Sequence, residues 1–317
     1  MIKILFNTGL PQNGLEYLSD FNIVMPPFGK TFPKDVLEKE IEDATVIVAC
    51  SDLNADTIKL AKNAKLIVVY GAGFDRVDIN SATENNIMVC NIPFTVTVPS
   101  AEFAFSLMIS LARKVVELDK NMRKLPSNHL FGIGKNMGQS LNGQTLGIVG
   151  MGRIGKQMAT YARAFGMKII YTSNSRKEEC DALGDTYVSL ETLLKEADFI
   201  SLHCPYNSDT HHLISEKNIN LIKPTAFIIN TARGSVISET ALLDALQNKK
   251  IAGAGLDVFE NEPHINPIFA SLDNVILAPH VGGNTVQARV LMAKEIAIQT
   301  NKVLAGEKPD QWLNAKG

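Results

Sequence analysis

One cluster of closely spaced glycines in the sequence could bind a phosphate group. The cluster consists of Gly150, Met151, Gly152, Arg153, Ile154 and Gly155. It follows an apolar run at 146–149 and opens a helix-like segment that ends near Gly166. The first glycine permits a tight turn, the second lets a pyrophosphate approach the backbone, and the third lets the helix lie against the strand. Because the helix start also provides N–H groups and a positive dipole end, this segment predicts a dinucleotide site.

The residues after the next predicted strand, 168–172, bear on which dinucleotide binds. An NAD site usually has Asp or Glu at this point, which binds the ribose 2′-hydroxyl. Here neutral donors and two cations stand instead: Thr172, Ser173, Asn174, Ser175, Arg176 and Lys177. They could hold a 2′-phosphate that a carboxylate would repel, so we predict NADPH in preference to NADH. A polar surface loop would have a similar composition.

Three further segments end predicted strands of the same sheet. They are NTARG at 230–234, GLDVFENEP at 255–263 and APHVGG at 278–283. In an open α/β sheet the ligand lies at the carboxyl ends of the strands. These segments contribute an arginine, acidic residues and a histidine, which can hold an anion and move a proton.

With GIVGMGRIG at 147–155 and GAGFDRVD at 71–78, these segments resemble the D-isomer-specific 2-hydroxyacid dehydrogenase family from about residue 45 to 290. The chain is most similar to the glyoxylate/hydroxypyruvate reductase branch, because YTSNSRK at 171–177 replaces an acidic strand end. The resemblance implies reduction of small 2-keto acids, such as glyoxylate and hydroxypyruvate, to D-2-hydroxy acids by NAD(P)H. It also implies a homodimer.

The resemblance implies catalytic roles for Arg233, Glu262 and His280. Reducing a 2-keto acid requires a hydride at the carbonyl carbon, a proton at its oxygen and a cation on the carboxylate. A guanidinium binds a carboxylate through two N–H groups, and an imidazole donates protons near neutral pH. A carboxylate on the other ring nitrogen fixes the orientation of the imidazole. Taken singly, each residue is more often a surface ion pair, a solvated acid or a buried histidine, so the prediction depends on their joint occurrence.

The resemblance also implies further contacts. Those with the cofactor involve Thr97, His203, Cys204, Pro205, Thr210, Thr231, Ala232, Asp257, His280 and Gly282. Those with the substrate involve Leu53, Ala72 and Gly73, besides Arg233 and His280. Asp257 could equally hold a structural turn, as could the glycines at 71–73. We predict no metal site, because the four cysteines include no C-x-x-C pair.

Two α/β sheets are needed to position these segments. Short β-branched runs occur at 2–6, 21–25, 45–50, 65–71 and 86–90, and again at 144–150, 168–173, 199–204, 226–232, 251–259 and 275–280. Helix-length intervals between them indicate parallel sheets. We predict two doubly wound, Rossmann-like domains with an active-site cleft between them. Residues 1–98 plus 287–317 form a flavodoxin-like substrate domain, and residues 99–286 bind the dinucleotide.

One long apolar helix is expected at 99–118, with Pro99 in its first turn and Ser100 as a capping residue. It is more apolar than one domain face requires, so it is a candidate dimer interface. A second helix at 286–303 is expected to return to the first domain.

The composition excludes several classes of protein. Of the 317 residues, 45% are hydrophobic, a fraction that argues against intrinsic disorder. The 31 Lys and Arg residues nearly balance the 33 Asp and Glu residues, which argues against nucleic acid or anionic lipid as a partner. The apolar start at 2–6 is too short for a secretion signal, and the run at 103–112 is shorter than the ~20 residues of a membrane span. We therefore expect a soluble, cytoplasmic protein.

Two alternatives remain open at this point. One is an NAD-linked phosphoglycerate dehydrogenase. The other is a non-catalytic, NAD(P)H-sensing binding protein similar to a corepressor, which could retain all three catalytic residues. The sequence does not distinguish which 2-keto acid or which reaction direction is physiological.

Overall fold

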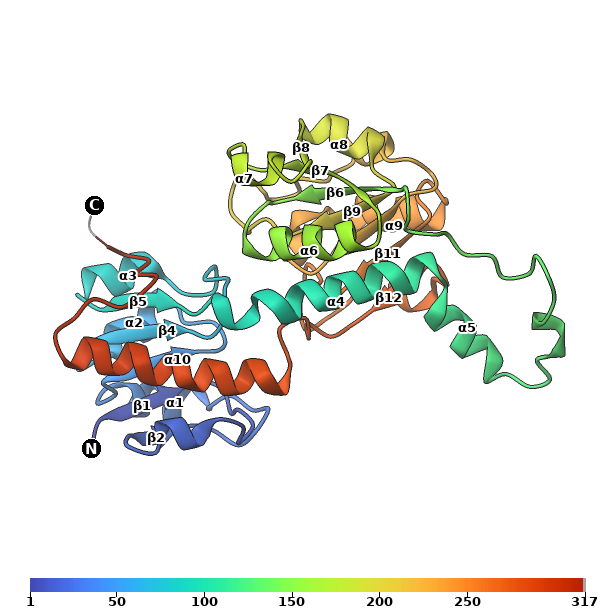
Figure 1. The fold of residues 1–317 in the computed structure, drawn as a ribbon. Helices are drawn as coiled ribbons and strands as arrows, with labels where there is room; N and C mark the ends of the chain where they lie inside the picture. The colour runs from blue at the N-terminus through green and yellow to red at the C-terminus, as the bar shows by residue number, and fades with distance from the viewer. Residues whose placement is uncertain (316–317) are drawn as a thin grey trace. The chain divides into compact units, whose positions relative to one another are not determined.

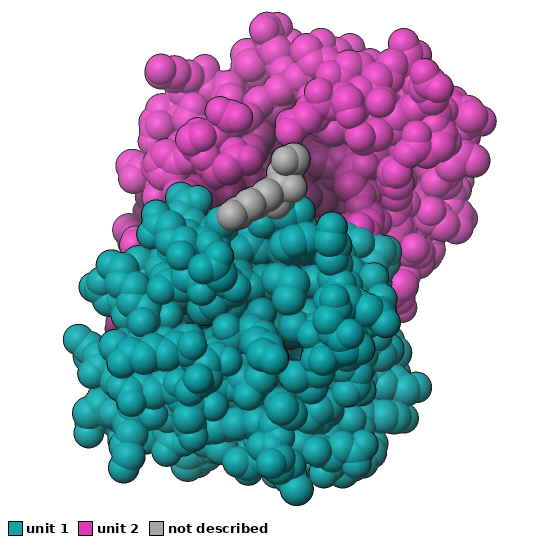
Figure 2. Space-filling view, turned by 90° about the vertical axis from the view of Figure 1, so that its left-hand side faces the viewer, with its two compact units in different colours: residues 1–96, 283–317 teal, residues 97–282 magenta. Residues whose placement is uncertain are grey.

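The chain folds around two separate β-sheets, each within its own compact unit. The computed structural model describes residues 1–315. Unit 1 comprises Met1–Val96 and Gly283–Gly317, and unit 2 comprises Thr97–Gly282 (Figure 2). Every pair of neighbouring strands in both sheets is parallel. The predicted class, two parallel α/β sheets, is therefore confirmed.

Unit 1 contains a five-stranded sheet in the order β2-β1-β3-β4-β5, the order of flavodoxin-like folds. Its strands are β1 (Lys3–Phe6), β2 (Asn22–Val24), β3 (Val46–Ala49), β4 (Leu66–Val69) and β5 (Met88–Asn91). Its helices are α1 (Lys34–Ile41), α2 (Ala55–Leu60), α3 (Ile79–Glu84) and α10 (Val286–Leu304).

Both faces of the unit 1 sheet are buried, because alternate residues of each strand belong to different core clusters. Ile4 and Phe6 lie in a cluster with Ile296 of α10. Leu5 lies in the other cluster, with Ile41 of α1 and residues of α2 and α3. Figure 1 shows α10 lying along this sheet, although it comes from the far end of the chain. Burial on both faces explains why these strands are continuous apolar runs rather than alternating patterns.

Unit 2 contains a seven-stranded sheet in the order β12-β11-β10-β9-β6-β7-β8. Its strands are β6 (Thr145–Val149), β7 (Lys168–Thr172), β8 (Thr186–Tyr187), β9 (Phe199–Leu202), β10 (Phe227–Asn230), β11 (Gly253–Leu256) and β12 (Val275–Leu277). Counted within the unit, this is the Rossmann order 3-2-1-4-5-6 with one added strand. Strand order reverses between β6 and β9, and ligands of such sheets bind at that point.

Helices cover both faces of the unit 2 sheet. They are α4 (Phe94–Ala112), α6 (Arg153–Ala164), α7 (Glu178–Asp181), α8 (Leu190–Glu196) and α9 (Glu239–Gln247). Helix α5 (Val115–Met122) follows α4 but buries none of its residues. Leu107 of α4 and Met158 of α6 pack in one core cluster with Ile148. Helices α8 and α9 pack in the other cluster, with Val149. The glycine turn that follows β6 is thus anchored by core on both sides.

The prediction of one helix at 99–118 is wrong. Helix α4 begins five residues earlier, at Phe94, so Pro99 lies inside it rather than in its first turn. The helix ends at Ala112, and Lys114 adopts a left-handed conformation (φ 55°) before α5 starts. A β-branched run before Pro99 gave no helix-start signal, and a left-handed lysine has no compositional marker.

Helix α4 is long and apolar enough to cross a membrane by length and composition alone. Its inner residues, including Ala104, Leu107 and Met108, are instead buried against the unit 2 sheet. This packing is that of a core helix.

One titratable side chain is held neutral at the end of β9. Burial lowers the pKa of His203 to about 4, and its Nε2 atom lies 2.8 Å from the hydroxyl of Ser201. The backbone N–H of His203 donates to Val149, at the end of β6. Protonating His203 in the folded chain would therefore place a charge in a buried position, which is costly.

This burial predicts a pH-dependent stability. The unfolded chain binds a proton at His203 near pH 6.5 and the folded chain only near pH 4, so the free energy of unfolding falls as the pH drops through that window. Between pH 7 and pH 4.5 we expect His203 to account for a loss of about 2 kcal/mol. Urea unfolding at both pH values measures it, and His203→Gln should show a smaller loss. Equal losses in both proteins would contradict this account.

Candidate active site

The glycine turn after β6 has a shape that suits a dinucleotide. Gly150 has a φ of 97°, and a Cβ there would lie 2.5 Å from the backbone nitrogen of Cys204. A Cβ on Gly155 would lie 2.2 Å from the carbonyl oxygen of Gly150, so only glycine lets α6 come this close. At Gly152, by contrast, a Cβ would meet nothing within 4 Å. The turn thus leaves open space where α6 begins, with Arg153 and Ile154 as its first residues.

The residues after β7 lie beside this turn, because the N–H of Gly150 donates to the carbonyl of Thr172. Ser173 donates its hydroxyl to the carbonyl of Ser175, and Asn174 lies between them. Arg176 is paired with the carboxylate of Asp181 at 2.5 Å. The predicted cations are therefore near the turn, but Arg176 shares its charge with an acid that the sequence analysis did not consider.

Arg233 follows β10 and is held by a buried amide that the sequence analysis missed. Asn230, 1% exposed, donates from Nδ2 to the carbonyl of Arg233 and accepts the N–H of Ala232. These two hydrogen bonds stabilise a tight turn directly after β10, and Arg233 lies in this turn. Arg233 also donates to the carbonyl of Ala232 at 2.8 Å. The position of Asn230, as the last residue of an apolar strand, was the signal available.

Thr231, within the same turn, has a hydroxyl that suits a ligand. Of the described residues 1–315, only Thr231 and Thr300 have a buried side-chain oxygen without a hydrogen-bond partner. Leaving such a group unpaired costs about 1–3 kcal/mol. A polar group of a bound cofactor would satisfy it.

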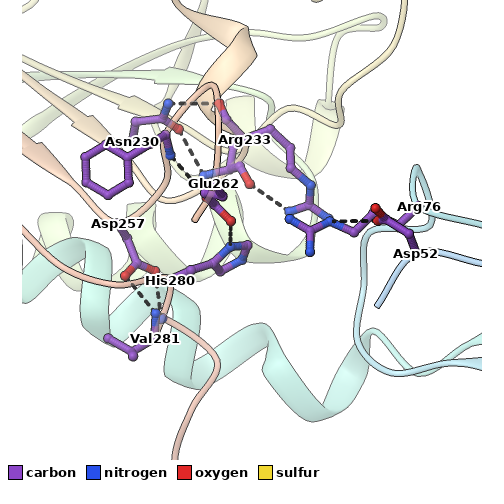
Figure 3. Close-up of polar contacts among 11 residues, drawn as sticks. Asp52, Arg76, Asn230, Arg233, Asp257, Glu262, His280 and Val281 are labelled. Carbon is purple, nitrogen blue, oxygen red and sulfur yellow. Dashed lines mark hydrogen bonds and ion pairs between the residues drawn. The ribbon is translucent and has the colours of Figure 1, made fainter. Parts of the chain in front are cut away.

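Glu262 and His280 form the central pair. Nδ1 of His280 lies 2.8 Å from Oε2 of Glu262, and Figure 3 shows the two side chains pointing at one another. The other carboxylate oxygen accepts the N–H of Phe259 at 3.1 Å. Because Nδ1 is engaged, Nε2 is the ring nitrogen that can meet a substrate. His280 is 41% exposed at its side chain, so that nitrogen is accessible within unit 2.

Asp257 holds the turn that carries His280. Its carboxylate accepts the N–H groups of Val281 and Gly282, both at 2.8 Å, and its carbonyl accepts the N–H of His280 (Figure 3). Burial raises the pKa of Asp257, and the two N–H donors counter this. The structural-turn alternative for Asp257 therefore has direct support from these contacts.

The segment after β9 contributes backbone more than side-chain chemistry. Burial raises the pKa of the Cys204 thiol to about 11, which leaves it protonated and unreactive. Thr210 donates its hydroxyl to the carbonyl of Pro205 and accepts the N–H of Asn207. These bonds fix the loop beside His203.

The remaining predicted residues lie elsewhere. The side chain of Leu53 is fully buried in the unit 1 core, so only the backbone around it could touch a substrate. Ala72 and Gly73 follow β4, and the carbonyl of Ala72 accepts the Asn91 amide. Thr97 lies within α4 rather than in a loop. Within residues 1–315, no group of three or more His, Cys, Asp or Glu could hold a metal ion.

The structure brings the three predicted catalytic residues to one edge of the unit 2 sheet. Arg233, Glu262 and His280 follow β10, β11 and β12, which are neighbours in the sheet. Carboxyl ends of parallel strands lie at the same edge. The arrangement provides a guanidinium, and an imidazole backed by a carboxylate, on the sheet that also carries the glycine turn.

Comparison with known proteins identifies the family. Residues 105–282 match the D-isomer specific 2-hydroxyacid dehydrogenase, NAD binding domain. The chain is 41% identical over 319 residues to a glyoxylate reductase of Thermococcus litoralis, covering 98% of this chain and 96% of the relative.

Solved structures agree. D-Lactate dehydrogenase of Aquifex aeolicus, complexed with NAD and lactic acid, matches with a TM-score of 0.88 at 30% identity, over 99% of this chain and 100% of that one. An NADPH-dependent glyoxylate/hydroxypyruvate reductase of Sinorhizobium meliloti, in complex with NADP and malonate, matches with a TM-score of 0.86 at 28% identity, over 98% and 96%. The resemblance inferred from the motifs is confirmed: the chain belongs to the D-isomer-specific 2-hydroxyacid dehydrogenase family of oxidoreductases.

Proposed function

We propose that this protein reduces small 2-keto acids, glyoxylate and hydroxypyruvate first, to D-2-hydroxy acids with NADPH. The observation that carries the proposal is the 2.8 Å pair of His280 and Glu262 at the strand edge where Arg233 also emerges. Relatives named as glyoxylate and hydroxypyruvate reductases support the substrate class. We further propose that unit 2 binds the dinucleotide, that unit 1 contributes the substrate contacts at Ala72 and Gly73, and that the protein is cytoplasmic.

Each catalytic residue has a separate task. The guanidinium of Arg233 binds the substrate carboxylate with two N–H groups and polarises the adjacent ketone. Nε2 of His280 donates a proton to the carbonyl oxygen as it gains electrons. Glu262 accepts the Nδ1–H of His280, which orients the ring and stabilises its charged form. When bound, a nicotinamide cofactor supplies the hydride that reaches the carbonyl carbon.

The residues around the glycine turn fit such a cofactor. Gly152 leaves open space at the start of α6, and the unpartnered hydroxyl of Thr231 lies in the turn that carries Arg233. The N–H groups at the start of α6 would hold the pyrophosphate of such a cofactor. Ser173, Arg176 and Lys177 would hold its 2′-phosphate.

Turnover assays test the reaction directly. We expect the protein to oxidise NADPH with glyoxylate or hydroxypyruvate, followed by absorbance across a panel of 2-keto acids. His280→Ala should lower kcat at least ~100-fold, because the proton donor is lost. Arg233→Ala should lower kcat/KM by a similar factor, chiefly through KM. Lys34→Ala, at an exposed lysine of α1, serves as the control. A wild-type protein that turns over no 2-keto acid would favour the sensor alternative instead.

The cofactor preference has its own test. We expect a higher kcat/KM with NADPH than with NADH. Arg176→Ala should lower the NADPH value by about 10-fold and leave the NADH value within about two-fold, because only NADPH carries the phosphate. Lys195→Ala, which removes an exposed cation of α8, is the matched control. Equal losses with both cofactors would rule out the proposed phosphate contact.

We also propose that the protein is a homodimer. The apolar residues Leu107, Met108 and Leu111 of the predicted interface helix at 99–118 are buried within unit 2, so we place the interface at α5 and the segment that follows it. Large apolar side chains are exposed there, including Leu125 (81%), Phe131 (67%) and Met137 (73%). A patch of this kind marks an association surface. In Figure 1 this segment forms a long loop that extends outward from α5 before the chain returns to β6.

Light scattering after gel filtration measures the oligomer. We expect twice the 34.6 kDa mass of one chain. The double variant Phe131→Asp, Ile133→Asp should become monomeric, because it places two charges in the apolar patch. Leu183→Asp, which is equally apolar and exposed elsewhere in unit 2, should remain dimeric. A monomeric wild-type protein would exclude this interface.

A further inference from the structure

The loop that carries Glu262 contains a second carboxylate, which the proposed reaction does not use. Glu260 is hydrogen bonded through both oxygens. Oε1 lies 2.7 Å from Nε2 of His212, and Oε2 accepts the N–H of Glu239, at the start of α9, at 3.3 Å. Three segments that are far apart in the sequence therefore meet at this one side chain. Its side chain is 24% exposed, so these bonds are only partly open to water.

His212 occupies a conformation that a histidine rarely adopts. Its φ is 47°, in the left-handed region that favours glycine and asparagine. The N–H of His212 donates to the carbonyl of Ser235 at 2.8 Å, and the neighbouring Ile214 forms a bridge with Ile237. These contacts hold the unfavourable backbone and direct the imidazole to Glu260. Backbone strain of this kind is concentrated at functional sites.

The backbone next to Glu260 also contacts the Glu262 carboxylate. The N–H of Phe259, the residue before Glu260, donates to Oε1 of Glu262. Gly234, next to Arg233, packs so closely on this backbone that a Cβ there would lie 1.9 Å from the Phe259 carbonyl carbon. A rotation at Glu260 would therefore disturb both the Glu262 carboxylate and the Arg233 turn.

The surrounding charges make His212 necessary for this arrangement. Burial raises the pKa of Glu239, and the charge of the nearby Glu260 raises it further. Glu216 also lies within electrostatic range of His212, and His211 stacks on its ring at 4.0 Å between centroids. Without the imidazole, Glu260 would face the Glu239 carboxyl with only one N–H donor to hold it.

We propose that His212 and Glu260 are positioning residues whose hydrogen bond holds the loop at 257–263 so that Glu262 meets His280. The inference rests on the proposed function, which gives Glu262 and His280 their task. It adds a residue of an adjacent loop to the machinery of that site.

Four variants of the full-length protein test this role: His212→Ala, His212→Gln, Glu260→Ala and the control Lys195→Ala, at an exposed lysine of α8. We expect His212→Ala and Glu260→Ala to lower kcat about 10-fold, while the dissociation constant of NADPH stays within two-fold, because the glycine turn is untouched. The amide of His212→Gln can still donate to Glu260, so it should recover most of the rate. Amide hydrogen exchange of the 257–263 segment should accelerate in His212→Ala and Glu260→Ala and not in Lys195→Ala.

A double-mutant cycle separates positioning from general stability. If His212 acts through Glu262, then His212→Ala should add little to the loss caused by Glu262→Gln. Independent, multiplying losses would overturn the proposal, as would unchanged kcat and exchange in His212→Ala. Absence of turnover in the wild type would instead refute the proposed function, and the exchange measurement would still decide whether His212 holds the loop.

Discussion

The site depends on the buried carboxylate of Asp257. It lies at the end of β11, is 1% exposed, and accepts two backbone N–H groups from the turn after β12. A buried charge is costly unless hydrogen bonds compensate it, so these contacts fix the turn firmly. This turn includes His280, whose φ is 55°. A histidine rarely adopts such a left-handed conformation unless other contacts stabilise it. This cross-strand connection positions the backbone that carries the His280 side of the His280–Glu262 pair.

Much of the fold could be predicted because its signals are local. The central strands of both sheets are short apolar runs, because helices bury both faces of each sheet. The glycine turn was equally readable, since Gly150 requires a positive φ and Gly155 a close helix approach. The family was identifiable for the same reason, because its motifs lie at strand ends. The roles of the individual site residues remain predictions.

The features that escaped prediction depend on contacts distant in the sequence. His212 and Glu260 are 48 residues apart, and no local pattern links them. Arg176 was read as a free cation, whereas Asp181 from α7 shares its charge. Strand β8 has two residues, too few to give a periodic pattern. The predicted start of α4 was wrong because proline usually occurs in the first turn of a helix, whereas Pro99 lies inside this one. Tertiary packing outweighs that local preference.

The parallel sheet brings the loops together at one edge, but the loop conformations determine how the side chains are oriented toward one another. His212 and His280 are both left-handed, and each bonds to a carboxylate of the same loop, Glu260 and Glu262 respectively. Each left-handed backbone costs about 1–2 kcal/mol, an amount that a charge-assisted hydrogen bond can offset. The loop at 257–263 thus bonds to a left-handed histidine at its middle, Glu260, and near its end, Glu262. A sheet of the same strand order that lacked these two pairs would not bring an imidazole and a carboxylate together at its edge, so this arrangement belongs to the loops and not to the fold.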